Sequence, residues 1–252
     1  MDRKQSHNVS DLMAKIKLVK GENFVTIEHT SSLTDQELME LIPYLMKQPF
    51  IQTSKNVNIL VDRKFSKETA TLLKEYGFKL HDKNVTVRKV LDELAEFEDG
   101  FLLKDLSELP VAEFKRVWEA SMKGSLNAPS SLNMDEQMRS VEMELGDDYK
   151  KSCMIAYENG APIGVVMPHI EPGTSEEGRL FYFGIIPGER GKGKSRLLHK
   201  QALEILKRDF KASYYIGSTG HNNLPMLKTF ERNGCAVVER NKVFKKINRN
   251  LK

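Results

Sequence analysis

Apolar and polar positions follow two periods along the chain, which together predict a mixture of helices and strands. Around residues 112–124, Phe114, Val117 and Trp118 recur at three- and four-residue spacing, which is typical of one buried helix face. Short apolar runs bounded by Gly, Pro or Asn indicate strands, and one hairpin has its turn at 158–160. In the second half of the chain we expect a strand with a turn at residues 101–109 and helices at 112–124 and 134–145. A hairpin at 153–170, a strand at 179–187, a helix at 190–209 and a closing strand–helix–strand unit at 214–246 are expected to follow.

The closing unit has a counterpart near the N-terminus. Residues 70–89 are similar to residues 227–246, with Gly77 aligned on Gly234. Both segments predict the end of an amphipathic helix, a Gly stop, a strand, a polar turn and a second short strand. Because the elements occur in the same order, the chain contains a candidate internal repeat.

The same offset continues upstream without a gap. It covers strand-like runs at residues 24–28 and 57–61, and between them a helix that begins at Thr34. Glu37, three residues after Thr34, completes the pattern of a capping box. Two generic strand–helix–strand segments could align in this way by chance. Our interpretation is that half a domain is fused to a whole one.

The composition is that of a soluble globular protein. The chain has 252 residues, is 40% hydrophobic and 29% charged, and has a net charge of +4, which excludes a disordered tail, a fibre and a small disulfide scaffold. Basic residues are spread among acids, so we expect no nucleic-acid partner. Cys153 and Cys235 lie outside any metal-binding spacing, so we expect no metal. With no signal peptide and no membrane span, a cytoplasmic monomer or homodimer is expected.

The most specific motif is GERGKGKS at residues 188–195, which follows a strand and precedes a helix. It satisfies G-x-x-x-x-G-K-[ST], the phosphate-binding pattern of nucleotide triphosphatases. Only residues 196–252 remain to build the rest of such a fold, and Pro187 stands at the strand exit. No later strand ends in the Asp that would hold Mg²⁺. A triphosphatase is therefore the weaker alternative.

A second pattern fits better. Residues 190–195 resemble [QR]-x-x-G-x-[GA], the signature of the GNAT N-acetyltransferase superfamily, and the resemblance covers residues 98–252. It implies an α+β fold, with a mixed central sheet and helices on both faces, in which this turn binds the pyrophosphate of acetyl-CoA. Glycines and a helix N-terminus suit an anion. The cofactor-binding residues implied are Gly184, Ile185, Ile186, Arg190, Gly191, Lys192, Gly193, Lys194, Ser195, Arg196, Asn223 and Phe230.

The flanking segments also resemble the family. The strand before the turn implies a splay at residues 184–186, where backbone groups pair with the pantetheine arm. Asn223 takes the family's Asn position, although a helix cap alone would explain it. Where the family often has a Tyr, this chain has Phe230, which cannot donate a proton. A non-catalytic acyl-CoA-binding or regulatory module therefore stays open as an alternative to catalysis.

For catalysis, the resemblance implies acetyl transfer to an amine of a small molecule, an amino acid or a peptide. Tyr182 and His221 are the candidates for proton handling near the turn. The acceptor region is expected at residues 121–145 and 169–178, which carry no motif. The segment 169–178 contains Glu171, Glu176 and Glu177. We interpret it as an acidic loop that could attract a cationic amine, although such loops are usually just solvated.

The first copy provides an internal control. Residues 31–38, which align with the Gly-rich turn, read SSLTDQEL and contain no Gly. Asp35 and Glu37 suit a capped helix but would repel a pyrophosphate. We therefore predict a degenerate partial GNAT-like domain at residues 1–97 that does not bind CoA, and an acetyltransferase domain at residues 98–252.

Overall fold

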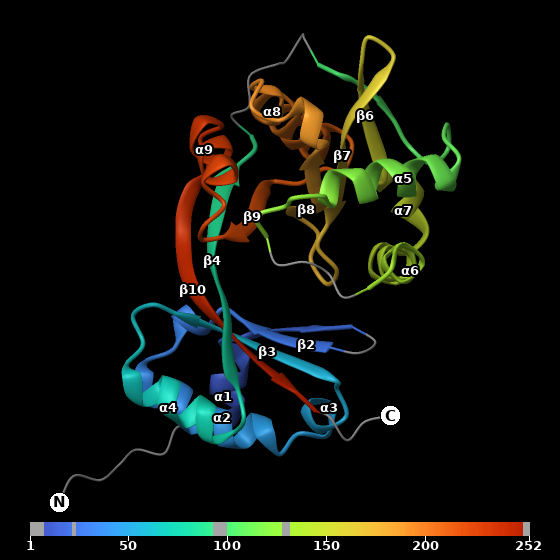
Figure 1. The fold of residues 1–252 in the computed structure, drawn as a ribbon. Helices are drawn as coiled ribbons and strands as arrows, with labels where there is room; N and C mark the ends of the chain where they lie inside the picture. Colours follow the sequence, from blue (N-terminus) through green and yellow to red (C-terminus); the bar gives the residue numbers. More distant parts are fainter. Residues whose placement is uncertain (1–7, 22–23, 93–99, 128–131, 249–252) are drawn as a thin grey trace, which may run out of the picture. The chain divides into compact units, whose positions relative to one another are not determined.

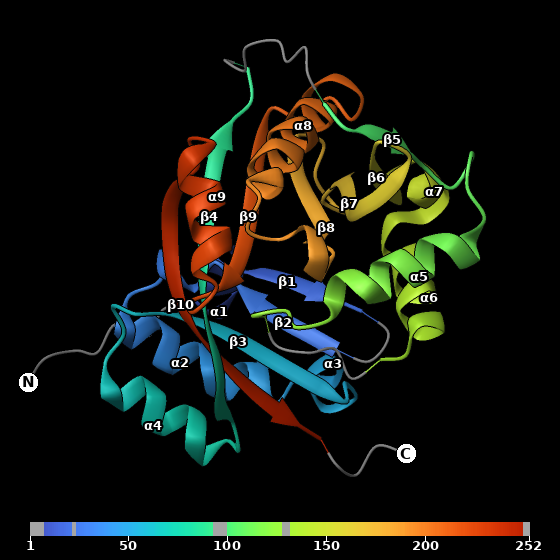
Figure 2. The ribbon, with the colours of Figure 1, turned by 45° about the horizontal axis from the view of Figure 1, so that its top comes forward.

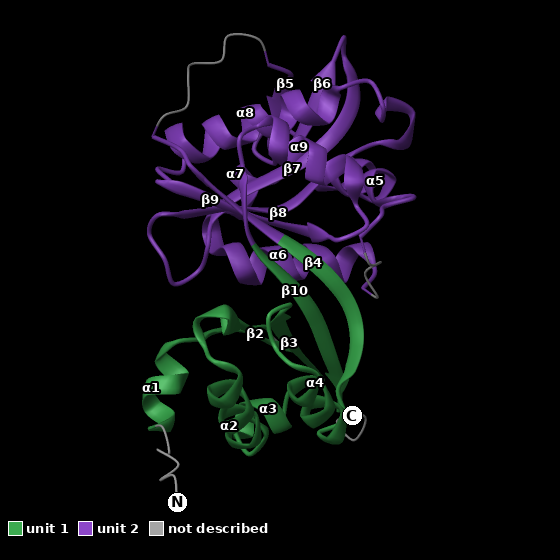
Figure 3. Ribbon diagram, turned by 90° about the vertical axis from the view of Figure 1, so that its left-hand side faces the viewer, with its two compact units in different colours: residues 1–85, 239–252 green, residues 86–238 purple. Residues whose placement is uncertain are grey.

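The structure, a computed structural model, describes residues 8–21, 24–92, 100–127 and 132–248. The chain divides into two compact units (Figure 3): unit 1 holds residues 1–85 and 239–252, and unit 2 holds residues 86–238. Two long strands, β4 (Lys79–Val90) and β10 (Ala236–Ile247), contribute residues to both units. The units therefore do not coincide with the segments 1–97 and 98–252, whose assignment as domains stays a prediction.

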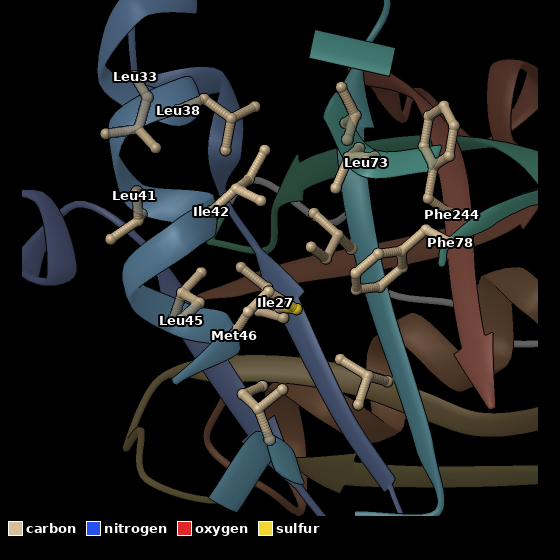
Figure 4. Close-up of a cluster of buried hydrophobic side chains, with 14 of the residues drawn as sticks. Ile27, Leu33, Leu38, Leu41, Ile42, Leu45, Met46, Leu73, Phe78 and Phe244 are labelled. Carbon is tan, nitrogen blue, oxygen red and sulfur yellow. The ribbon is translucent and has the colours of Figure 1, made fainter. Parts of the chain in front are cut away.

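Unit 1 is a sheet covered by helices on one face. Its elements before β4 are α1 (Val9–Ala14), β1 (Lys17–Lys20), β2 (Phe24–Glu28), α2 (Asp35–Met46), α3 (Pro49–Gln52), β3 (Asn56–Asp62) and α4 (Lys67–Glu75). Its strands lie in the order β1-β2-β3-β10-β4. Alternate residues of β2 and β3 are buried, and they join side chains from all four helices in one hydrophobic cluster (Figure 4). The period-two pattern of these strands thus fixes which face the helices cover.

The internal repeat is present in the elements themselves. Lys67 and Leu224, the first residues of α4 and of α9 (Leu224–Arg232), are 157 positions apart, and so are the last residues of the two helices. The same spacing relates both ends of β4 to both ends of β10. The predicted polar turn inside each of these strands is wrong, because each is one continuous strand of 12 residues. Side chains such as the half-buried Asn84 are accommodated along the strand without breaking its backbone.

Unit 2 contains a mixed sheet with helices on both faces, as the sequence predicts (Figure 1). Its elements between β4 and α9 are β5 (Leu102–Lys104), α5 (Val111–Met122), α6 (Met134–Leu145), α7 (Tyr149–Ser152), β6 (Met154–Glu158), β7 (Ala161–Ile170), β8 (Glu177–Ile185), α8 (Lys194–Arg208) and β9 (Tyr214–Gly220). The strand order is β4-β9-β8-β7-β6-β5. Helix α6 begins and ends where the sequence predicts, after a capping box at Asn133. The hairpin turn also falls where expected, at Asn159 and Gly160, both with positive φ.

Two clusters define the faces of this sheet. Side chains of α5 and α6 pack with Val165 and Met167 of β7. Leu198 and Ala202 of α8 pack on the other side with Val166, the residue between those two. Because neighbouring residues of a strand point to opposite faces, α5 and α6 cover one face and α8 covers the other.

The last strand of each copy is exchanged. Strand β10, which ends the second copy, pairs antiparallel with β3 of the first copy, from Asn241 opposite Asp62 to Ile247 opposite Asn56. The end of β4, which closes the first copy, lies next to β9 of the second copy. The backbone just after β4 keeps this arrangement, since the Leu91 N–H donates to the Ser213 carbonyl at 2.9 Å.

Candidate functional site

Strands β8 and β9 begin together and then separate. Their parallel register consists of Glu177 opposite Tyr214 and Gly178 opposite Tyr215, and it ends there. Strand β8 continues to Ile185 with β7 as its antiparallel partner. We call the separation of β8 and β9 beyond Gly178 the fork. The splay that the sequence places at residues 184–186 thus starts several residues earlier.

A bulge in β8 turns Tyr182 toward α5. Phe183 faces Val166 and Leu180 faces Pro168, so that Phe181 and Tyr182 together oppose one residue of β7. In a regular strand two neighbours point to opposite faces, but here both rings reach Trp118, with centroid separations of 6.5 and 5.7 Å. The bulge therefore places the predicted proton-handling tyrosine on the α5 face of the fork.

The hydroxyl of Tyr182 lies over Gly184. A Cβ atom at Gly184 would stand 2.6 Å from the Tyr182 Oη, so only Gly leaves room for this rotamer. Burial raises the pKa of Tyr182 to about 12, and the nearby Arg190 opposes that rise. The phenol is therefore protonated at neutral pH and can donate a hydrogen bond toward the fork.

Strand β8 leads through a Gly-rich turn into α8 (Figure 2). Gly191 and Gly193 have φ angles of 77° and 80°, a region that other residues rarely adopt. Gly193 is the N-cap of α8 and supplies no side-chain cap, and the first turn has no acidic residue. The backbone N–H groups of residues 191–195 donate to no acceptor in the described part of the chain. Five consecutive donors at a helix N-terminus form a ready site for an anion.

Arg190 holds the turn in place rather than facing outward. Its Nε donates to the Ile185 carbonyl at 2.9 Å, and its two terminal nitrogens donate to the carbonyls of Ser121 and Gly124 at 2.9 and 3.1 Å. Those two carbonyls lie at the C-terminal end of α5, where helix carbonyls lack intrahelical partners. The arginine that begins the signature thus ties the turn to β8 and to α5.

The lysines of the turn are engaged with carboxylates. Lys192 Nζ lies 3.1 Å from Glu189 Oε2, and Lys194 donates to both Glu158 and Glu189. The bonds from Lys194 and then Lys192 hold the pKa of the Glu189 carboxyl below its ordinary value. Arg196 is exposed on the first turn of α8. The groups best placed for an anion are therefore the backbone N–H donors and Arg196.

The remaining predicted cofactor residues lie around α9. Ser195 Oγ is 3.2 Å from Thr229 Oγ1, and Asn223 caps α9 by accepting the Met226 N–H at 3.3 Å. Phe230 is buried, with its ring centroid 5.4 Å from that of His199. The aligned residue of the first copy, Leu73, is buried as well, so packing accounts for an apolar side chain at this position.

Asn127 is a residue of the site that sequence reasoning missed. Its Oδ1 accepts hydrogen bonds from Thr219 Oγ1 and Gly220 N at 3.0 Å each, and from Asn223 Nδ2 at 3.2 Å. One side-chain oxygen thereby ties the loop after α5 to the end of β9 and to the cap of α9. The sequence shows only a polar loop at this point, and no local pattern indicates a partner about 90 residues away.

His221, the second predicted proton-handling residue, is exposed in the turn between β9 and α9. Within the described ranges, three or more His, Cys, Asp or Glu side chains nowhere gather in a way that could hold a metal ion. Nor does any helix of these ranges combine the length and apolar character that crossing a membrane requires.

Comparisons with known proteins agree with this geometry. The acetyltransferase (GNAT) family matches residues 110–235, half of the chain. No curated protein sequence matches. Among solved structures, a GCN5-related N-acetyltransferase from Sphaerobacter thermophilus has a TM-score of 0.57 at 14% identity, covering 93% of this chain and 76% of its own.

Two further structures are similar over most of the chain. A tandem GNAT protein from the clavulanic acid biosynthesis pathway has a TM-score of 0.54 at 11% identity, covering 92% of this chain and 78% of its own. A functionally unknown protein from Staphylococcus epidermidis has a TM-score of 0.57 at 13% identity, covering 96% of this chain and 98% of its own. At such identities these likenesses concern the fold, and the tandem architecture agrees with a half-copy preceding the second copy.

Proposed function

Because the chain belongs to the GNAT family of acetyltransferases, we propose that it transfers an acetyl group from acetyl-CoA to a primary amine of a small molecule, an amino acid or a peptide. The observation that carries the proposal is the run of five backbone N–H donors at residues 191–195 without an acceptor. Such a run at a helix N-terminus fits a diphosphate, which is the doubly charged linkage of CoA.

The fork supports the same proposal. Beyond Gly178, β8 has no register with β9, so backbone groups on that side are open to an extended ligand. A pantetheine arm carries two amides and can pair with such groups as an added strand, which is the role we propose for residues 184–186. The turn would then hold the diphosphate while the strand holds the arm, and the thioester would lie toward Tyr182.

The chemistry needs a proton taken from the amine and a proton given to the departing sulfur. Acetyl-CoA supplies the acetyl group as a thioester. The assignment of Tyr182 and His221 to proton handling stays a prediction. Tyr182 is suited to donation, because its raised pKa of about 12 keeps the hydroxyl protonated. His221 is exposed and can exchange protons with water.

Two measurements test the proposal. Calorimetric titration of the full chain with acetyl-CoA is expected to give one site per chain, and CoA is expected to compete for it. Release of free thiol from acetyl-CoA is then followed with a panel of primary amines. Thiol release that depends on the amine supports acetyl transfer. Tight binding without turnover for any amine would favour the non-catalytic acyl-CoA-binding module, and an absence of binding would contradict both.

A further inference from the structure

The acidic segment before β8 is not the solvated loop that the sequence suggests. Glu171 and Glu177 are only 5% and 6% exposed, whereas Glu176 between them is exposed. Arg179 Nε lies 2.6 Å from Glu177 Oε1 and 3.2 Å from Glu171 Oε2. The Tyr214 hydroxyl donates to Glu177 Oε2 at 3.3 Å. These residues form an ordered polar cluster within unit 2.

The cluster stands where the fork opens. His169 of β7 faces Arg179, the first residue of β8 beyond the register with β9. Residues that face each other across two strands share a face of the sheet, so the His169 side chain lies on the face of Arg179 and Phe181. The ring centroids of His169 and Phe181 are 6.4 Å apart. Phe181 and its neighbour Tyr182 both contact the Trp118 ring. The cluster and Tyr182 therefore lie on one face.

His169 is the unexplained member of this cluster. It is 5% exposed, and neither ring nitrogen is hydrogen-bonded to any part of the chain that the structure describes. Glu171 Oε2 is 3.8 Å from Nε2, too far for a hydrogen bond but close enough to stabilise a positive ring. A buried imidazole normally satisfies both nitrogens, and an exception points to a role in binding or catalysis.

The groups around His169 are charged. From β8 it faces Arg179, whose side chain is 22% exposed, and from the segment after β7 it faces Glu171. From α6, the exposed Glu144 interacts electrostatically with His169 and with both of these neighbours. An imidazole with no hydrogen-bond partner among the residues that the structure describes, beside two carboxylates, matches a primary ammonium, which offers N–H donors and a positive charge.

We propose that His169 is the residue that receives the amino group of the acceptor and takes its proton. The inference rests on the proposed acetyl transfer and names the acceptor end of that site. The ammonium donates a proton to the free imidazole nitrogen, and Glu171 stabilises the resulting imidazolium. The amine lone pair forms the C–N bond, and the C–S bond breaks with its electrons on sulfur. The nitrogen then loses its second proton to solvent, and the sulfur takes a proton from the Tyr182 hydroxyl, which regains one from solvent. When the product leaves, His169 returns its proton to water.

The pH profile of turnover tests this role. In His169→Gln, we expect kcat/KM for the best amine of the panel to fall by about 10²- to 10⁴-fold, with the Kd for acetyl-CoA unchanged. The fall of kcat/KM at acidic pH, which reports protonation of the base, should disappear. His81→Gln, an exposed histidine of β4, serves as the control. An acidic limb that persists in His169→Gln, or that is lost in His221→Gln instead, would overturn the proposal while leaving acetyl transfer intact.

Neutralising one carboxylate sharpens the test. Glu171→Gln should lower kcat/KM for the amine, because the imidazolium that forms when His169 takes the proton loses its stabilising neighbour. Glu177→Gln is the matched variant, since Glu177 is also a buried carboxylate that pairs with Arg179. An equal loss of kcat/KM in the two variants would contradict a specific pairing of His169 with Glu171.

A binding measurement works without any substrate being known. The six histidines can be followed by nitrogen-15 NMR, with the His169 signal identified by its absence in His169→Gln. Titration with n-propylammonium in the presence of CoA is expected to shift the His169 signal, more weakly in Glu171→Gln. CoA binding without any shift at His169 would overturn the inference alone, whereas failure to bind CoA would contradict the proposed function.

Discussion

The two copies of the strand–turn–helix unit share a framework and differ in what satisfies the start of the helix. In unit 1, Thr34 and Glu37 cap α2 reciprocally, and Glu37 also pairs with Lys15 at 2.6 Å. In unit 2, Gly193 caps α8 without a side chain, and the N–H groups of residues 191–195 have no acceptor among the described residues. The comparison teaches that one backbone design can either be closed by side-chain caps or keep backbone N–H donors without an acceptor, according to a few side chains at the turn.

Replacing Gly193 should have the largest effect on the difference between the two copies. Gly193→Glu places a strained residue and a negative charge at the N-terminus of α8, so we expect acetyl-CoA binding to weaken by about 100-fold or more without unfolding the chain. Titration calorimetry gives the affinity, and circular dichroism verifies folding. Gly193→Gln carries the residue of the first copy, Gln36, and separates strain from charge. Gly160→Glu has the same backbone region in the hairpin turn and should bind normally; unchanged affinity in Gly193→Glu would exclude the turn from the site.

Replacing Arg190 by its counterpart should have the next largest effect. Leu33 occupies this position in the first copy, where it is buried. Arg190→Leu removes three hydrogen bonds from the turn to the carbonyls of β8 and α5. We expect acetyl-CoA to bind about 10-fold more weakly, because the backbone N–H donors of the turn are less ordered. The corresponding loss of binding free energy is about 1.4 kcal/mol. An affinity equal to that of the wild type, measured in parallel with thermal unfolding, would show that Arg190 contributes to folding alone.

Glu37 provides a pH-dependent effect of smaller size. The hydrogen bond from Lys15, followed by that from the Thr34 N–H, lowers the pKa of Glu37 from 4.5 to about 2. A carboxyl whose pKa is lowered by folding stabilises the fold at pH values above the pKa that it has in the unfolded chain. This contribution is lost as the pH falls toward the lowered pKa. Glu37→Gln should therefore lower the free energy of unfolding by about 1 kcal/mol at pH 7. The difference in this free energy from wild type should shrink between about pH 4.5 and 2. Chemical denaturation at several pH values measures it, with the exposed Glu75→Gln as control; a difference that grows on acidification would contradict the assignment.

The smallest effect is expected from adding a glycine to the turn of the first copy. Ser32→Gly introduces a glycine into the turn before α2, but Asp35 and Glu37 stay at the helix start. Because these carboxylates repel a diphosphate, and because Thr34 and Glu37 already satisfy the cap, the stoichiometry should stay at one acetyl-CoA per chain. Calorimetric titration decides this, and a second equivalent bound by the variant would refute the view that unit 1 is incompetent.

Sequence reasoning was most successful where the signal is local. The capping box at Thr34, the bounds of α6 and the hairpin at Asn159 and Gly160 follow from side chains and backbone preferences within a few residues. The Gly-rich turn was found for the same reason, since only glycine adopts its φ angles freely. The repeat was recognisable because two local patterns occur at one constant spacing.

Properties that depend on pairing were not visible. The continuous backbone of β4 and β10 results from neighbours on both sides, which outweigh the polar residues near Asn84. His169 follows Pro168 in an apolar strand and looks like an ordinary core residue until its register with Arg179 is known. Asn127 likewise acquires its meaning from donors far away in the chain.

The exchanged strands limit how this protein can be divided. A fragment that starts at residue 98 would lack β4, whose end belongs to unit 2, and would leave the edge of β9 uncovered. The same fragment would carry β10 without β3, its antiparallel partner. Bare strand edges recruit other chains. Separately produced halves would therefore tend to aggregate, and a gene encoding them apart would need both products made together.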